Sequence, residues 1–237
     1  RLQYLKDVVL ARILDDPTFS VLNSLIFFHQ VEIVNFLQSN EQFLRELFNI
    51  FGPDETDAPR MREAVLFIQN CCSVAKTIQA QSRAHLYTNF IQFGLFPVVM
   101  FALRHHDAAV RVAGTDILVS LIDHDPHMVR MQIFNAIKEK TTPLTDTLIE
   151  LLLVEVDLGV KSQMADAIKI LLDPSTTQAQ MDMMNRAQNG EFVQKQRGSG
   201  PHMTIAPQTD AFISSFYEDS AKRLFQPLKD LEHRTSM

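Results

Sequence analysis

Apolar residues recur at intervals of three and four along most of the chain, and polar residues occupy the positions between them. The first such face carries Leu2, Leu5, Val9 and Ile13, which is the spacing of one side of a helix. No segment shows the strict alternation of apolar and polar residues that is typical of a half-buried strand. The pattern therefore predicts a chain built almost entirely of helices.

Polar breaks, prolines and glycines divide this pattern into separate helices. Asp16 followed by Pro17 is typical of a helix start, with an acidic cap and proline at the first helical position. Gly94 fits the left-handed residue that ends many helices, and Pro97 lies early in the next helix. Further helices are predicted over approximately 60–77, 82–93, 108–122, 126–137, 144–154 and 159–172.

The run "NSLIFFHQVEIVNFLQSNEQFLREL" (23–47) is dense in apolar residues and contains no reactive motif. Its periodicity predicts two helices and the start of a third, with Ser39 and Asn40 as the hinge between the latter two. Phe27 and Phe28 are adjacent, so on a helix they point about 100° apart. In a layered arrangement we expect both rings to be buried, although one of them facing a partner is the alternative.

Two segments separated by 50 positions share one pattern. "DAAVRVAGTDILVSLID" (107–123) aligns with "DLGVKSQMADAIKILLD" (157–173), and Arg111 then falls opposite Lys161. Each segment begins with an acidic cap, continues with valine and a basic residue, and ends at aspartate. Such repetition is typical of the inner helix of armadillo or HEAT units. We predict an all-α fold, an armadillo/HEAT-like α-solenoid of stacked helical repeats, with a closed bundle as the alternative.

The composition changes along the chain and divides it into segments. Residues 1–174 carry the predicted repeats, whereas 175–207 are polar and are expected to form a flexible loop. Within that loop "GSGPHM" (198–203) resembles a protease-site and cloning scar, with a natural loop as the alternative. An amphipathic helix at 208–232 is expected to dock on the repeats, and 233–237 form a tail. Because the chain starts with arginine, we expect it to be part of a longer protein.

Charge and cysteine content narrow the function classes. A formal net charge of −6 argues against a general phosphate-binding surface, so we do not expect nucleic acid as a partner, although the sequence leaves room for a local basic patch. Cys71 and Cys72 are adjacent and cannot supply a disulfide framework, which favours a reducing compartment. We expect both in a helix, one facing the core. No apolar run reaches roughly 18 uninterrupted residues, so no membrane association is expected.

Histidines are the residues that first suggest chemistry. His105 and His106, and separately His124 and His127, lie beside aspartates. The two pairs flank one predicted helix and should be about 25 Å apart, so they cannot share one metal ion. Solvated loops are the simpler interpretation of each pair. The chain also lacks a GxSxG element, a phosphate-binding loop and a dinucleotide fingerprint. We therefore expect no enzyme activity, no metal and no cofactor.

Basic side chains around the repeat are the remaining candidates for a binding site. Because inner helices of a solenoid line a groove, Arg111 and Lys161 could form a ladder that binds acidic or phosphorylated peptides. The alternative is that each basic residue pairs with an aspartate of a neighbouring repeat, such as Asp116 or Asp157. The candidate partner-binding residues are Arg104, Arg111, Arg130 and Lys161.

Several stretches carry a resemblance to a known family. They are "YLKDVVL", "LNSLIFFHQVEIVNFLQ", "FLRELF", "IQAQSRAHLYTNFIQFGLFPVVMFAL", "VRVAGTDILVSLIDHDPHMVR", "IKILLDP" and "FISSFYEDSAKRLFQPL". Together they resemble the central helical-repeat domain of protein phosphatase 4 regulatory subunit 3, the suppressor-of-MEK or Smek family. The resemblance covers the chain except for 175–207, where a long loop favours a fungal or divergent member, or an engineered join.

The resemblance implies a non-catalytic regulatory or scaffold domain of the Ser/Thr protein phosphatase 4 complex. The implied partners are the catalytic subunit, a second regulatory subunit and phosphoprotein substrates, and the implied setting is the DNA damage response in the nucleus and cytoplasm. No contact residue is carried over from the family. A nucleic-acid- or chromatin-binding helical-repeat module is the alternative function.

Overall fold

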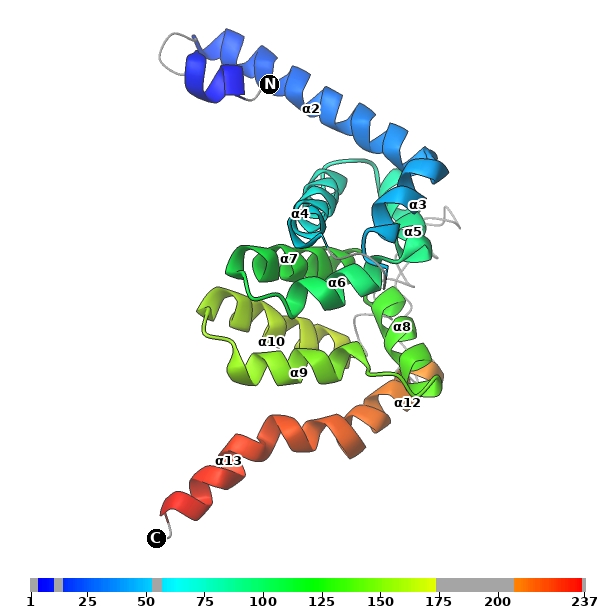
Figure 1. Cartoon of the computed structure of the whole chain (residues 1–237), viewed down its shortest axis with the longest axis vertical. Helices are drawn as coiled ribbons and strands as arrows, with labels where there is room; N and C mark the ends of the chain where they lie inside the picture. Colours follow the sequence, from blue (N-terminus) through cyan, green and yellow to red (C-terminus); the bar gives the residue numbers. More distant parts are fainter. Residues whose placement is uncertain (1–3, 11–14, 53–56, 174–206, 236–237) are drawn as a thin grey trace, which may run out of the picture. The chain divides into compact units, whose positions relative to one another are not determined.

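The computed structural model describes the chain except for residues 1–3, 11–14, 53–56, 174–206 and 236–237. Within the described ranges every regular element is a helix and no strand is present (Figure 1). The chain divides into two compact units, Arg1–Val98 and Val99–Met237. The predicted loop at 175–207 falls almost wholly outside the described residues.

The first unit contains, in chain order, the short π-helical segment η1 (Leu5–Val9), α2 (Asp16–Ser39), α3 (Glu41–Asn49), α4 (Ala58–Ala75), α5 (Ala80–Phe93) and the start of α6 (Leu95–Leu103). The second unit contains the end of α6, then α7 (Ala108–His124), α8 (Pro126–Lys138), α9 (Leu144–Val154), α10 (Leu158–Leu172), α12 (Pro207–Ser215), the π-helical segment η2 (Phe216–Ser220) and α13 (Ala221–Thr235).

The start of α2 lies one residue earlier than the sequence pattern predicts. Asp15, not Asp16, is the N-cap, because its Oδ1 accepts the backbone N–H of Thr18 at 3.2 Å. Asp16 and Pro17 then occupy the first helical turn. Two aspartates precede Pro17, and either could cap the helix by its residue type. The hydrogen bond to Thr18 shows that Asp15 does so.

The run 23–47 forms one continuous helix followed by α3, so the prediction of two helices before Ser39 is wrong. No proline or glycine interrupts the chain between Phe28 and Val31, and the two apolar faces belong to successive turns of α2. The hinge after Ser39 is confirmed: Asn40 ends α2 and caps α3, where its Oδ1 accepts the N–H of Phe43 at 3.0 Å.

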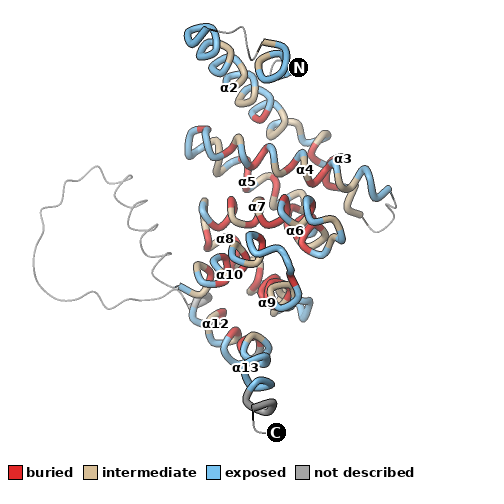
Figure 2. The backbone as a smooth tube through the Cα atoms, turned by 90° about the vertical axis from the view of Figure 1, so that its left-hand side faces the viewer, coloured by how far each residue is buried: buried red, intermediate tan, exposed pale blue. Residues whose placement is uncertain are grey.

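The exposure of α2 also differs from the expectation. Most of α2 is exposed (Figure 2). Val34 is the one residue of this helix that is buried, and Phe27 and Phe28 are 38% and 61% exposed. The prediction that both rings are buried is therefore wrong for the described residues, because α3, α4 and α5 cover mainly the C-terminal part of α2. By length and composition alone, α2 is long and apolar enough to cross a membrane. Core helices of soluble proteins and signal sequences meet the same two criteria.

The core of the first unit lies between α3, α4 and α5. Phe48 and Phe90 meet edge to face, with ring centroids 5.5 Å apart, and both rings are buried. Cys71 and Cys72 of α4 are both buried, rather than one of them as predicted. Burial raises the pKa of the Cys71 thiol to about 12 and also raises the pKa of Cys72. Gly94 ends α5 with φ 119°, which confirms the predicted left-handed cap.

The second unit shows the predicted repeat as a stack. α7 and α10, the two segments aligned by the 50-residue shift, lie side by side (Figure 1). Their caps are equivalent: Asp107 accepts the N–H of Ala109 at 2.9 Å, and Asp157 accepts the N–H of Val160 at 3.0 Å. Each amphipathic helix thus buries its apolar face on the next repeat. The predicted class, an all-α helical-repeat solenoid, is confirmed.

Close packing within the second unit depends on one glycine of α7. A Cβ on Gly114 would lie 2.6 Å from Cβ of Ala102 and 3.3 Å from the backbone nitrogen of Leu103. The missing side chain therefore lets the backbones of α6 and α7 approach each other. At the end of the chain α12 packs on α8 and η2 contacts α9, with Phe212 and Phe216 buried.

Candidate functional site

Arg111, the centre of the predicted basic ladder, is held by groups of its own unit. Its Nε and Nη2 donate to the two carboxylate oxygens of Glu155, at 2.7 and 3.1 Å. Its Nη1 donates to the backbone carbonyls of His105 and His106. The Glu155 side chain is 3% exposed and also accepts two backbone N–H groups. The pair joins the start of α7 to the segment between α9 and α10, and this acidic partner is neither Asp116 nor Asp157.

This geometry makes the stability of the fold depend on pH. Hydrogen bonding to Arg111 lowers the pKa of Glu155 from 4.5 to about 2, and two backbone N–H groups act in the same direction. A depressed folded-state pKa gives stability that is present above the unfolded value and is lost as the pH falls toward the folded one. We expect the urea midpoint to decrease as the pH falls from about 5 to about 2.

Glu155→Gln should remove part of this pH dependence, because an amide does not titrate. The wild-type and variant urea midpoints should differ most at neutral pH and converge near about pH 2. Glu63→Gln, which alters an exposed carboxylate beside Arg62, is the matched control and should follow the wild-type curve. A constant separation between the Glu155→Gln and wild-type curves would contradict the assignment.

Arg130 is the second of the predicted basic residues whose side chain contacts its own unit. Its side chain is 2% exposed, and it donates to the backbone carbonyls of Ile170, Leu171 and Asp173 at 2.7–2.8 Å. These carbonyls belong to the C-terminal end of α10, where helix geometry supplies no partner. Burial lowers the pKa of Arg130 from its ordinary value, while Asp173 and Asp125 oppose that change. The guanidinium thus caps α10 from α8.

Arg104 and Lys161 complete the predicted set. Arg104 is exposed at the end of α6, and its Nη2 donates to the hydroxyl of Thr147 at 2.9 Å. Lys161 is half-buried in α10, at the position equivalent to Arg111. The structure therefore does not show the four residues as one row of free cations. A role for them in partner binding stays a prediction.

The histidine pairs beside aspartates form no metal site within the described residues. His105 and His106 stack with ring centroids 4.3 Å apart, and Nδ1 of His105 accepts the backbone N–H of Asp107. In the part of the chain that the structure describes, no group of three or more His, Cys, Asp or Glu side chains has metal-binding geometry.

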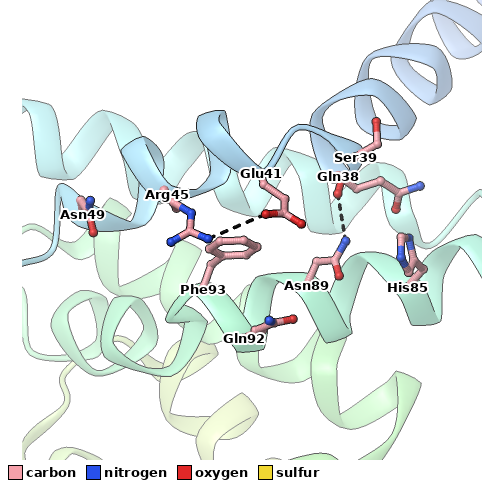
Figure 3. Close-up of a pocket in the computed structure, with 9 residues that line it drawn as sticks. All are labelled: Gln38, Ser39, Glu41, Arg45, Asn49, His85, Asn89, Gln92 and Phe93. Atoms are coloured by element: carbon pink, nitrogen blue, oxygen red, sulfur yellow. Dashed lines mark hydrogen bonds and ion pairs between the residues drawn. The ribbon is translucent and has the colours of Figure 1, made fainter.

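A polar groove in the first unit is the feature that sequence reasoning missed. It has a volume of about 560 Å³ and is built from the end of α2, the outer face of α3 and one face of α5 (Figure 3). Its lining is rich in carboxamides and consists of Gln38, Ser39, Glu41, Arg45, Asn49, His85, Asn89, Gln92 and Phe93. Figure 3 shows Asn49 and His85 at opposite ends, with Gln92 between them.

Two contacts fix the shape of this groove. Nδ2 of Asn89 donates to the backbone carbonyl of Gln38 at 2.9 Å, which ties α5 to the last turn of α2. The guanidinium of Arg45 lies over the ring of Phe93, 5.8 Å from its centroid. Arg45 also pairs with Glu41 at 3.8 Å, but both side chains are largely exposed. The sequence signal was the spacing of His85, Asn89 and Gln92 on one face of α5.

Comparison with known proteins places this architecture in a family. A family model described as phosphatase 4 regulatory subunit 3 matches residues 1–237. The chain belongs to the phosphatase 4 regulatory subunit 3 family. This confirms the resemblance seen in the motifs, and the match spans both units.

Relatives of the phosphatase 4 regulatory subunit 3 family agree with this placement. The chain is 36% identical over 247 residues to an uncharacterised protein of Schizosaccharomyces pombe, which covers 100% of the chain and 28% of that protein. It is 38% identical over 173 residues to Suppressor of Mek1 of Dictyostelium discoideum, covering 73% of the chain and 16% of that protein. It is 30% identical over 181 residues to the Drosophila melanogaster serine/threonine-protein phosphatase 4 regulatory subunit 3, covering 73% of the chain and 18% of that protein.

The chain thus spans between 16% and 28% of the length of these relatives. No solved structure gives a significant match. Because the family is named for a regulatory subunit, a non-catalytic role is implied.

Proposed function

We propose that this chain is a non-catalytic scaffold domain of the Ser/Thr protein phosphatase 4 complex. In this role it joins the catalytic subunit and a second regulatory subunit and directs them to phosphoprotein substrates. The observation that carries the proposal is the family match over residues 1–237. The name of the Drosophila melanogaster relative supports the same complex.

The architecture supports a scaffold role in physical terms. Stacked helical repeats present long surfaces, and binding energy in such proteins comes from a few well-packed contacts spread over a large area. In the second unit, Arg111 and Arg130 are committed to holding repeats together. The first unit offers a polar groove and the exposed apolar side of α2. Both features suit protein recognition, and action in the nucleus and cytoplasm stays a prediction.

A binding experiment with purified components tests the scaffold role. The immobilised chain is incubated with purified phosphatase 4 catalytic subunit, with the purified second regulatory subunit, and with both together. We expect retention of the catalytic subunit, with stronger retention when both are present, because multivalent contacts raise the effective concentration. A purified phosphatase of another family is the control for unspecific capture. If neither phosphatase 4 subunit is retained, the proposal is wrong for this domain.

A further inference from the structure

We propose that the groove between α2, α3 and α5 binds an extended segment of a partner polypeptide, through main-chain hydrogen bonds and one acidic side chain. This site is independent of the basic residues predicted from the sequence. It also does not depend on phosphatase 4 being the partner, so it can be tested separately from the function proposed above.

The carboxamides of the groove fit a polypeptide main chain. A carboxamide carries both a donor and an acceptor, which is the pair that a peptide unit offers in return. Asn89 is already positioned by its bond to the carbonyl of Gln38, so its orientation is fixed before a ligand arrives. The carboxamides of Asn49 and Gln92 are exposed in the groove and can pair with a main-chain N–H or carbonyl.

The spacing along α5 selects an extended conformation. His85 and Asn89 are four residues apart, so they are separated by about 6 Å along the helix axis. Equivalent groups of an extended chain repeat after two residues, at about 6.7 Å. Successive turns of α5 can therefore meet alternate residues of the same peptide. A helical ligand would not fit this chemistry, because its main-chain groups are already paired internally.

The positive charge of Arg45, near the Asn49 end of the groove, selects an acidic side chain (Figure 3). The guanidinium of Arg45 lies over the ring of Phe93, and this contact favours its position beside the groove. Its pairing with Glu41 is long, at 3.8 Å, and the two side chains are 68% and 76% exposed. Such a pair is weak in water. Glu41 also lies in the first turn of α3, where a carboxylate remains favourable without Arg45. An incoming carboxylate can therefore pair with the guanidinium of Arg45, and the loss of the pair with Glu41 costs little free energy.

Selection from a random-peptide phage library tests the site without knowledge of the natural partner. The wild-type chain should enrich peptides that contain Asp or Glu. The Arg45→Glu variant should enrich peptides with Lys or Arg instead, because residues 41 and 45 are then both acidic. A purely structural role of Arg45 would not reverse the charge of the selected peptides. Arg62→Glu, a charge reversal at an arginine of α4 whose side chain is 40% exposed and lies outside the groove, is the matched control and should still select acidic peptides.

Binding of the best wild-type peptide then tests the carboxamides. Fluorescence anisotropy should show Kd raised about tenfold by Gln92→Ala and by Asn49→Ala, since each removes hydrogen bonds to the peptide. Both side chains are exposed, so the fold should survive, and circular dichroism verifies this. Thr88→Ala, exposed on the same helix but outside the groove, should leave Kd unchanged. The proposal is overturned if no peptide is enriched, or if Arg45→Glu and Gln92→Ala leave selection and Kd as they were.

Discussion

Arg111→Met is expected to lower the free energy of unfolding of the second unit by about 3–5 kcal/mol, because it leaves a buried carboxylate without its counter-charge. The Glu155 side chain is 3% exposed and would retain two backbone N–H donors and no cation. The carbonyls of His105 and His106 would lose their donor as well. Urea unfolding of the whole chain, followed by circular dichroism, measures the change. Because the chain contains two units, the data should be fitted for two transitions.

A double variant separates the ion pair from general packing at this site. Arg111→Met combined with Glu155→Met should recover most of the loss, since an apolar pair of similar volume avoids the cost of burying charge. Lys169→Met breaks an exposed pair with Asp166 and should change stability by less than about 1 kcal/mol. A single variant as stable as the Lys169→Met control would show that the buried pair does not hold the repeats together.

Arg130→Met should cost about 3 kcal/mol, because three carbonyls at the end of α10 lose a charged donor whose side chain is buried. The guanidinium bonds to Ile170, Leu171 and Asp173 are all 2.8 Å or shorter. We expect hydrogen exchange to accelerate first in the last turn of α10, before the rest of the second unit. Local fraying of this kind is what loss of a cap predicts.

The matched control for Arg130 is an arginine that forms only exposed contacts. Arg223→Met breaks contacts with Asp146 and Glu150, and the Arg223 side chain is 56% exposed. Its effect on the free energy of unfolding should stay below about 1 kcal/mol. Equal effects of the two variants, or unchanged exchange in α10, would contradict a capping role for Arg130.

Helix boundaries were largely predictable because they depend on local chemistry. Asn40, Asp107 and Asp157 cap the helices that follow them, and Gly94 ends α5. Each of these roles is decided within one turn of the chain, by a short polar side chain or by a positive φ angle. The one-residue error at Asp15 and the false break within α2 also have local causes. Two adjacent aspartates compete for one cap, and apolar periodicity alone does not show where a helix ends.

The contacts of the basic residues were not predictable, because they depend on the geometry of distant segments. The alignment placed Arg111 opposite Lys161 correctly, yet the acid that meets Arg111 is Glu155, which lies before the aligned segment. The sequence gives no spacing rule for an arginine that reaches across repeats to a loop. The same is true of Arg130. Its partners are backbone carbonyls, which every residue type carries, so the sequence does not reveal them.

The groove escaped prediction for a related reason. Its lining comes from 38–49 and from 85–93, two segments joined only by the fold. Asn and Gln on the outer face of a helix are ordinary surface residues when each helix is considered alone. Phe27 and Phe28 were predicted to be buried but are exposed. An apolar residue in a helical pattern shows which face of the helix is apolar, but it does not show whether another element covers that face.

The two buried cysteines make the first unit chemically observable on its own. Because burial keeps the thiols of Cys71 and Cys72 protonated at neutral pH, an alkylating reagent reacts with them only when α4 separates from its neighbours. The arginine contacts that hold the second unit involve no cysteine. Alkylation rate therefore reports opening of the first unit, the unit in which circular dichroism alone cannot identify a local change.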